Sequence, residues 1–143
     1  MLREGETFPV ESLPGPLERP TVVYFYPADF TAGCTQEAHD FNRLYADYQE
    51  AGVDIVGVST DTTASHERFA AECGLRFPLV ADARGALTSR LGLMKDYGEY
   101  GHLAARVTLL LDADGVIRRI WRVGEVERHA DEVLAAAREL AEA

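Results

Sequence analysis

Residues 21–38 read TVVYFYPADFTAGCTQEA, and this stretch joins a strand pattern directly to a helix pattern. The apolar, β-branched and aromatic run at 21–26 indicates a buried strand, which Pro27 ends. From Cys34 onward, apolar residues recur with helical spacing along one stripe until Gly52 stops the pattern. A cysteine therefore stands at the point where a loop opens a helix.

The rest of the chain continues to alternate between strands and helices. The pattern predicts, in order, a strand at 53–59, a helix from about 61 to 73, a short strand at 77–81, a short helix at 84–91, a loop at 94–102, a hairpin of strands at 106–111 and 116–123, and an amphipathic helix at 129–142. Four of the six prolines lie in the first twenty residues, so irregular structure is expected there. This order predicts one thioredoxin-like α/β domain over residues 1–143, with a central mixed sheet and helices on both faces.

The composition narrows the possible classes of function. The chain has 143 residues and a formal net charge of −10, which argues against nucleic acid or anionic membrane as a partner because both require a basic face. The sequence has no apolar stretch of about 18 residues. Residues 1–10 lack the basic-then-apolar pattern of a signal peptide, so a cytoplasmic location is expected. In a reducing compartment, the two cysteines, Cys34 and Cys73, are seldom a permanent disulfide.

Cys34 has neighbours that suit a reactive thiol. A thiol in the first helical turn lies near free backbone N–H groups and the positive end of the helix dipole, which favour the thiolate. Thr31 offers a hydroxyl three residues earlier, and Pro27 stiffens the loop and can shield the thiolate from water. The alternative is a small buried hydrophobic residue at the head of a core-facing helix.

A family signature follows from these residues. Pro27, Thr31 and Cys34 form a Pro-x-x-x-Thr-x-x-Cys motif, and segment 24–38 closely resembles the active-site segment of peroxiredoxins. The most similar branch is peroxiredoxin Q, or bacterioferritin comigratory protein. The resemblance extends to the C-terminus through segments 58–61, 65–69, 74–82, 106–112 and 129–134.

The resemblance implies a role for each site residue. Cys34 becomes the peroxidatic cysteine, with Thr31 as a hydrogen-bond partner for peroxide and thiolate. Arg106, which its local pattern alone would make a surface residue at a strand end, matches the family's active-site arginine. Glu37 matches a position that orients this arginine, although a simple helix-surface carboxylate is the alternative. The implied enzyme reduces hydrogen peroxide and organic hydroperoxides without metal, haem, flavin or other cofactor.

The chain departs from the family pattern at four places. Ala32 stands where the branch usually has proline, and Ala28 where relatives often have lysine. His39 occupies the position at which many members carry the resolving cysteine, so that thiol is missing. The segment between Gly5 and Pro27 is also shorter than usual, which gives the domain a shortened N-terminal part, about residues 1–20.

Cys73 is the candidate for the vacant resolving role. It ends the helix after the second strand. Some members of the branch place the resolving cysteine on this helix, about one turn earlier than Cys73. A helix C-terminus disfavours the thiolate, which would leave Cys73 a poor first nucleophile but adequate for attack on a sulfenic acid. A Cys34–Cys73 disulfide requires Cα atoms within about 7 Å. The alternative is a packing residue in a one-cysteine peroxidase recycled by an external thiol.

Other readings of the cysteines are weaker. Thr31 and Glu37 lie three residues on either side of Cys34, so the Cys-x-x-Cys of a disulfide reductase is missing. A metal site built from both cysteines, His39 and His66 lacks the paired spacings of zinc sites. A redox sensor or thiol-dependent chaperone would use the same sulfenic chemistry without sustained turnover. The peroxidase interpretation implies a monomer reduced by thioredoxin or a similar dithiol.

Overall fold

A five-stranded mixed sheet forms the centre of the computed structural model, which describes residues 2–142. The strand order is β3-β2-β1-β6-β7, with bounds Thr21–Phe25 (β1), Asp54–Ser59 (β2), Leu79–Ala81 (β3), Val107–Leu111 (β6) and Ile117–Arg122 (β7). β1, β2 and β3 run parallel, whereas β6 pairs antiparallel with both β1 and β7. The predicted mixed sheet is confirmed.

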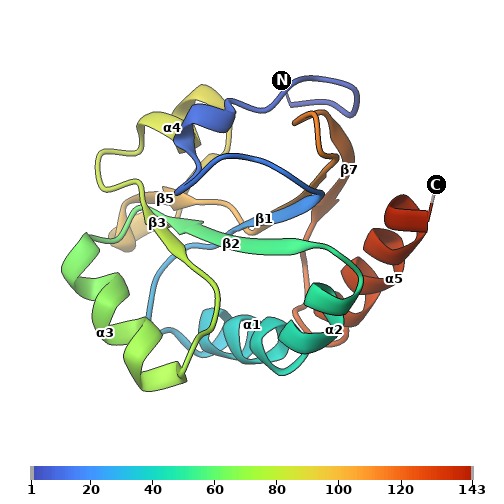
Figure 1. Ribbon diagram of the computed structural model, residues 1–143. Helices are drawn as coiled ribbons and strands as arrows, with labels where there is room; N and C mark the ends of the chain where they lie inside the picture. Colours follow the sequence, from blue (N-terminus) through green and yellow to red (C-terminus); the bar gives the residue numbers. More distant parts are fainter. Residues whose placement is uncertain (1, 143) are drawn as a thin grey trace.

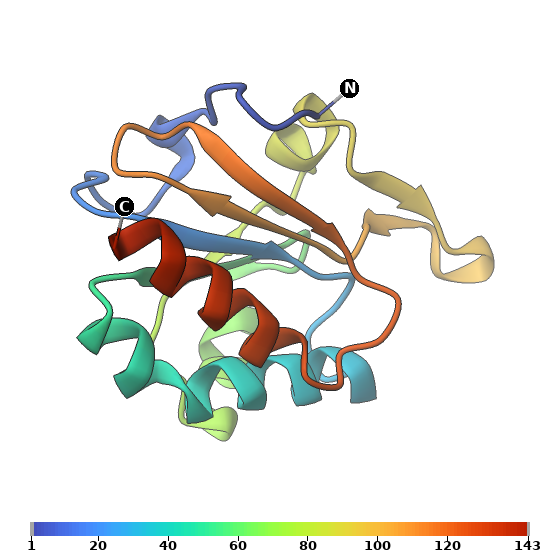
Figure 2. The ribbon, with the colours of Figure 1, turned by 90° about the vertical axis from the view of Figure 1, so that its right-hand side faces the viewer.

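Helices cover both faces of this sheet, but unequally (Figures 1 and 2). The helices are Ala32–Arg43 (α1), Tyr45–Glu50 (α2), Thr63–Cys73 (α3), Ala86–Arg90 (α4) and His129–Glu142 (α5). One face packs against α1, α2, α3 and α5, and the other packs against α4 and the N-terminal segment. Side chains of β1 alternate between two hydrophobic cores. Tyr24 packs in the core beneath α1, α2, α3 and α5, and Phe25 packs in the core beneath α4.

The helix predicted from Cys34 to Gly52 is two helices instead of one. The break is at Leu44, whose φ of −93° and ψ of 4° lie outside the helical range. No glycine or proline marks this position in the sequence, so local propensity gives no sign of it. Beyond the break, Tyr48 is buried and its hydroxyl donates to the Ala130 carbonyl at 2.7 Å, which ties α2 to α5.

The prediction of a loop at 94–102 is wrong, because this segment contributes to a second, two-stranded sheet. Strands Met94–Asp96 (β4) and His102–Ala104 (β5) pair antiparallel across a 3₁₀ turn at Gly98–Tyr100. Gly98 and Gly101 both have positive φ, which lets the chain reverse within a few residues. Figure 2 shows this ribbon reaching beyond the main sheet.

The N-terminal segment is irregular, as predicted, but it is held against the sheet. It contains one 3₁₀ turn, Val10–Ser12, and Thr7 forms an isolated bridge with Val116. Phe8 is buried against the core that α4 covers. Within residues 2–142, no helix is long and apolar enough to cross a membrane.

Candidate active site

Cys34 is the third residue of α1 and is buried, with 1% of its surface accessible. Thr31 is the N-cap, in extended conformation, and its carbonyl accepts the Thr35 N–H at 2.9 Å to open the helix. The sulfur therefore lies in the first turn, where backbone N–H groups favour an anion. Cys34 is a free thiol.

Arg106 bridges Cys34 and Glu37. One guanidinium nitrogen, Nη2, donates to Cys34 Sγ at 3.3 Å, and the other, Nη1, donates to Glu37 Oε1 at 2.7 Å. Arg106 directly precedes β6, and the antiparallel pairing of β6 with β1 brings it to the strand end that leads into α1. The sheet thus unites groups 72 residues apart in the sequence.

Glu37 is a buried carboxyl group rather than the surface residue of the alternative interpretation. Its side chain is 1% exposed, and within residues 2–142 its second oxygen, Oε2, has no hydrogen-bond partner. Burial raises the pKa of Glu37 to about 7, although the charge and hydrogen bond of Arg106 oppose this shift. Burial acts to lower the pKa of Arg106, but Glu37 and Cys34 outweigh it and raise that pKa. Arg106 is therefore a fixed cation between two acidic groups.

The raised pKa of Glu37 predicts a pH-dependent stability. Below the unfolded-state pKa, near 4.5, the group is protonated in both states; as pH rises toward 7, the unfolded chain loses the proton first. The free energy of unfolding should therefore fall over this window by at most a few kcal/mol, about 1.4 per pKa unit. Glu37→Gln should remove this component, as measured by urea unfolding at pH 4.5 and 7.5. The exposed control Glu139→Gln should retain it; an identical pH dependence in both variants would contradict the assignment.

Thr31 and Pro27 lie in the loop that connects β1 to α1. The Thr31 hydroxyl donates to the Ala28 carbonyl at 2.8 Å, so its oxygen is left to accept. The hydrogen bonds of Thr31 go to Ala28 and Thr35 and do not reach Cys34. Its role toward peroxide remains a prediction, as does the shielding role of half-buried Pro27.

Cys73 is the last residue of α3, followed by Gly74 in the left-handed conformation that ends the helix. It is a free, partly buried thiol that packs against the same core as Cys34. Burial raises the pKa of Cys73, with smaller contributions from Glu72 and Asp29, in keeping with a poor first nucleophile. Its resolving role remains a prediction.

A second polar cluster beside the active-site loop was not assigned a function from the sequence. The cluster consists of Tyr26, Asp29, Ser59, Asp61, Ser65 and His66. Asp29 and His66 form a buried ion pair with 2.7 Å between Oδ2 and Nδ1. All six members lie within the segments that resemble the family, but only the fold brings them together. The metal quartet considered above is not assembled: among residues 2–142, His66 instead lies near Asp29 and Asp61.

Comparisons with known proteins identify one family and several relatives with similar names. The AhpC/TSA family matches residues 2–120. Peroxiredoxin Bcp of Xanthomonas campestris pv. campestris is 44% identical over 118 residues, which span 80% of this chain and 74% of that protein. The chloroplastic Peroxiredoxin Q of Populus jackii is 37% identical over 133 residues; the match covers 92% of this chain but only 60% of the poplar protein.

Solved structures agree with these sequence relatives. A cysteine-to-serine mutant of Xylella fastidiosa PrxQ superimposes with a TM-score of 0.87 at 30% identity and covers 97% of both chains. The Bacterioferritin Comigratory Protein of Xanthomonas campestris, studied for its alkyl peroxide reduction activity, gives a TM-score of 0.80 at 41% identity. That match covers 87% of this chain and 81% of the other.

Proposed function

Because the chain belongs to the AhpC/TSA family and is a peroxiredoxin, we propose that it reduces alkyl hydroperoxides and hydrogen peroxide with Cys34 as the nucleophile. The observation that carries this assignment is the Arg106 guanidinium, which donates to both Cys34 Sγ and Glu37 Oε1. A fixed cation beside the sulfur stabilises the thiolate and the charge that develops as the O–O bond breaks.

The first step is a displacement at oxygen. The Cys34 thiolate attacks the terminal peroxide oxygen, forms an S–O bond and breaks the O–O bond. The sulfur becomes a sulfenic acid, and the departing alkoxide or hydroxide takes up a proton to leave as alcohol or water. The loop of Pro27 and Thr31 would bind the peroxide, with the Thr31 oxygen accepting its O–H.

The second step removes the sulfenic acid. The Cys73 thiol attacks the Cys34 sulfur, forming a disulfide and releasing water, and an external dithiol then reduces this bond by exchange. Both cysteines border the core on the helical side of the sheet, which supports the pairing. For this cycle we propose thioredoxin as the dithiol and a monomer that acts in the cytoplasm.

The resolving step can be tested by peptide mapping. After one equivalent of hydrogen peroxide, the parent chain should yield a Cys34–Cys73 peptide under non-reducing conditions. Cys73→Ser should retain the rate of the first oxidation within about twofold, because Cys73 takes no part in attack on peroxide. The variant should accumulate sulfenic acid, detectable with dimedone, and stop after one equivalent when thioredoxin, its reductase and NADPH are supplied. Continued turnover by Cys73→Ser would instead establish a one-cysteine peroxidase.

A further inference from the structure

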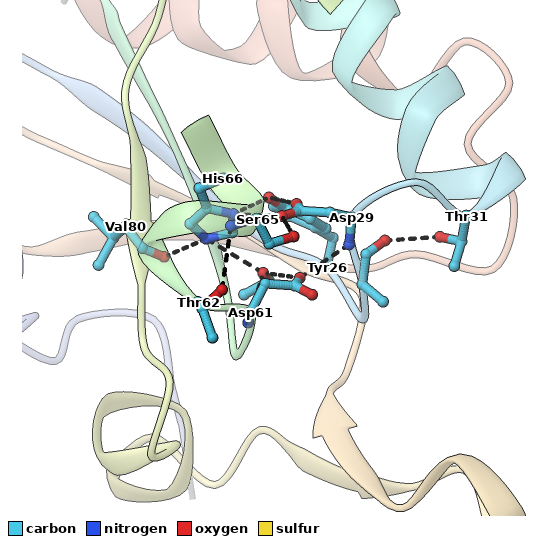
Figure 3. A network of polar contacts seen from close by, with 10 residues as sticks. Tyr26, Asp29, Thr31, Asp61, Thr62, Ser65, His66 and Val80 are labelled. Atoms are coloured by element: carbon cyan, nitrogen blue, oxygen red, sulfur yellow. Dashed lines mark hydrogen bonds and ion pairs between the residues drawn. The ribbon is translucent and has the colours of Figure 1, made fainter. Parts of the chain in front are cut away.

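Asp29 lies on the loop between β1 and α1 and is 7% exposed. Its carboxylate accepts hydrogen bonds from the Tyr26 hydroxyl at 2.6 Å and the Ser65 hydroxyl at 2.8 Å, and pairs with His66 Nδ1 at 2.7 Å (Figure 3). Burial alone would raise the pKa of Asp29, but these hydrogen bonds outweigh it and lower that pKa. The group is therefore a buried carboxylate with several donors.

The surroundings of His66 favour a charged imidazole. Nδ1 faces the Asp29 carboxylate, and Nε2 lies 3.0 Å from the Val80 carbonyl, which can only accept (Figure 3). A neutral imidazole has one N–H and would leave one of these acceptors facing a lone pair, whereas the imidazolium satisfies both. Burial acts to lower the pKa of His66, but Asp29 outweighs it and raises that pKa.

The cluster fits a hydrogen-bonded ion pair better than a metal centre. One atom from each of Asp29, Asp61 and His66 lies within 4.8 Å of the others. However, Asp61 Oδ2 already accepts the Ser59 hydroxyl and the Asp29 N–H. Both nitrogens of His66 are also used, so a cation would have to displace existing partners.

The loop that Asp29 anchors carries backbone strain. Phe30 has a φ of 66°, a left-handed conformation that is unfavourable for a residue with a large side chain. Strain of this kind persists only where surrounding contacts fix the chain. The contacts of Asp29 with Asp61 and His66 supply that constraint one residue before Phe30 and two before Thr31.

We propose that Asp29 and His66 are positioning residues for the peroxidase reaction: the charged pair fixes segment 27–31 against α3 and β3, and so places the peroxide-binding loop over Cys34. Loss of the His66 proton should loosen this loop and slow attack on peroxide. The inference rests on the proposed function, because its readout is the oxidation of Cys34.

The pH dependence follows from the groups that face His66 on every side. They are Asp29 from the active-site loop, Tyr26 directly after β1, and Asp61 from the turn after β2. Its neighbour on α3, Glu67, is exposed. Because Asp29 raises the pKa of His66, the imidazolium persists to higher pH than in a free histidine and is lost as pH rises through that shifted pKa.

The test measures the rate constant for Cys34 oxidation between pH 5 and 10, in a Cys73→Ser background so that one thiol reacts. The rate should fall by about tenfold at high pH, because misplacement of reacting groups slows a reaction, by about 10²-fold for an error of about 1 Å. The midpoint of the fall should coincide with the titration of His66 followed by NMR. Asp29→Asn should shift the falling limb to lower pH, and His66→Gln should remove it and lower the rate at pH 7 by about tenfold.

His39→Gln is the matched control, since His39 is an exposed histidine on the same helix as Cys34. It should reproduce the full pH profile of the Cys73→Ser parent. If His66→Gln does not fold, as judged by circular dichroism, the proposal is tested by the pH profiles of Asp29→Asn and of the parent. A parent rate that stays constant through the titration of His66 would overturn the proposal, whereas a parent that consumes no peroxide would overturn the proposed function itself.

Discussion

Cys34→Ser should abolish peroxide consumption. The substitution keeps the size of the side chain but replaces a thiolate with a hydroxyl group, which stays protonated at neutral pH and is a far weaker nucleophile. Loss of an enzyme's covalent nucleophile lowers turnover by several powers of ten, so a fall of about 10⁴-fold or more is expected. Peroxide loss can be followed with thioredoxin, thioredoxin reductase and NADPH, or directly by a colorimetric peroxide assay.

The matched control is Cys73→Ser, which makes the same chemical change at the other cysteine. It should consume one equivalent of peroxide per chain, whereas Cys34→Ser should consume none. Because Cys34 is 1% exposed, the fold of both variants should be checked by circular dichroism. A Cys34→Ser variant that is folded and still turns over peroxide would exclude Cys34 as the nucleophile. A parent chain that stops after one equivalent despite thioredoxin would favour the sensor or chaperone alternative.

Arg106→Gln should lower the rate of Cys34 oxidation by about 10²–10³-fold, the usual effect of removing a preorganised donor that stabilises developing charge. The guanidinium has a second task, because it also donates to buried Glu37. With a pKa of about 7 even beside Arg106, Glu37 can take up a proton when the cation is removed. The fold should therefore survive the loss of its charge partner.

Two further variants separate charge from geometry at Arg106. Arg106→Lys restores the charge but cannot donate from two fixed nitrogens to Cys34 and Glu37 at once, so it should recover only part of the rate. Combining Arg106→Gln with Glu37→Gln removes the unpaired acid and should recover stability in urea but not activity. Stopped-flow oxidation of Cys34 and the ultraviolet absorbance of the thiolate provide the measurements. A rate for Arg106→Gln within threefold of the parent would exclude the arginine from the reaction.

The strands and main helices were predictable because their signals are local. The apolar run at 21–26 and the glycine that ends α3 identify these elements without knowledge of the fold. The break at Leu44 and the β4–β5 ribbon were not predicted. The first has no glycine or proline to mark it, and the second is a pair of three-residue strands in a glycine- and tyrosine-rich segment.

The candidate site was predictable in part. Cys34 stood out because of its place at a helix start, whereas Arg106 was identified only by family resemblance, since no local pattern connects residues 72 positions apart. The burial of Glu37 decided between two interpretations that its helical position left open. The Asp29–His66 pair depends on the meeting of two loops, a helix and a strand, which no sequence spacing reveals.

The distance along the chain between Cys34 and Arg106 also sets the order in which the protein becomes reactive during synthesis. A ribosome that adds about 5–20 residues per second makes the cysteine several seconds before the arginine. During that interval β1 also lacks its neighbour β6, so the central sheet cannot close. A nascent chain thus carries Cys34 without its contact to the Arg106 guanidinium, which forms only when β6 pairs with β1.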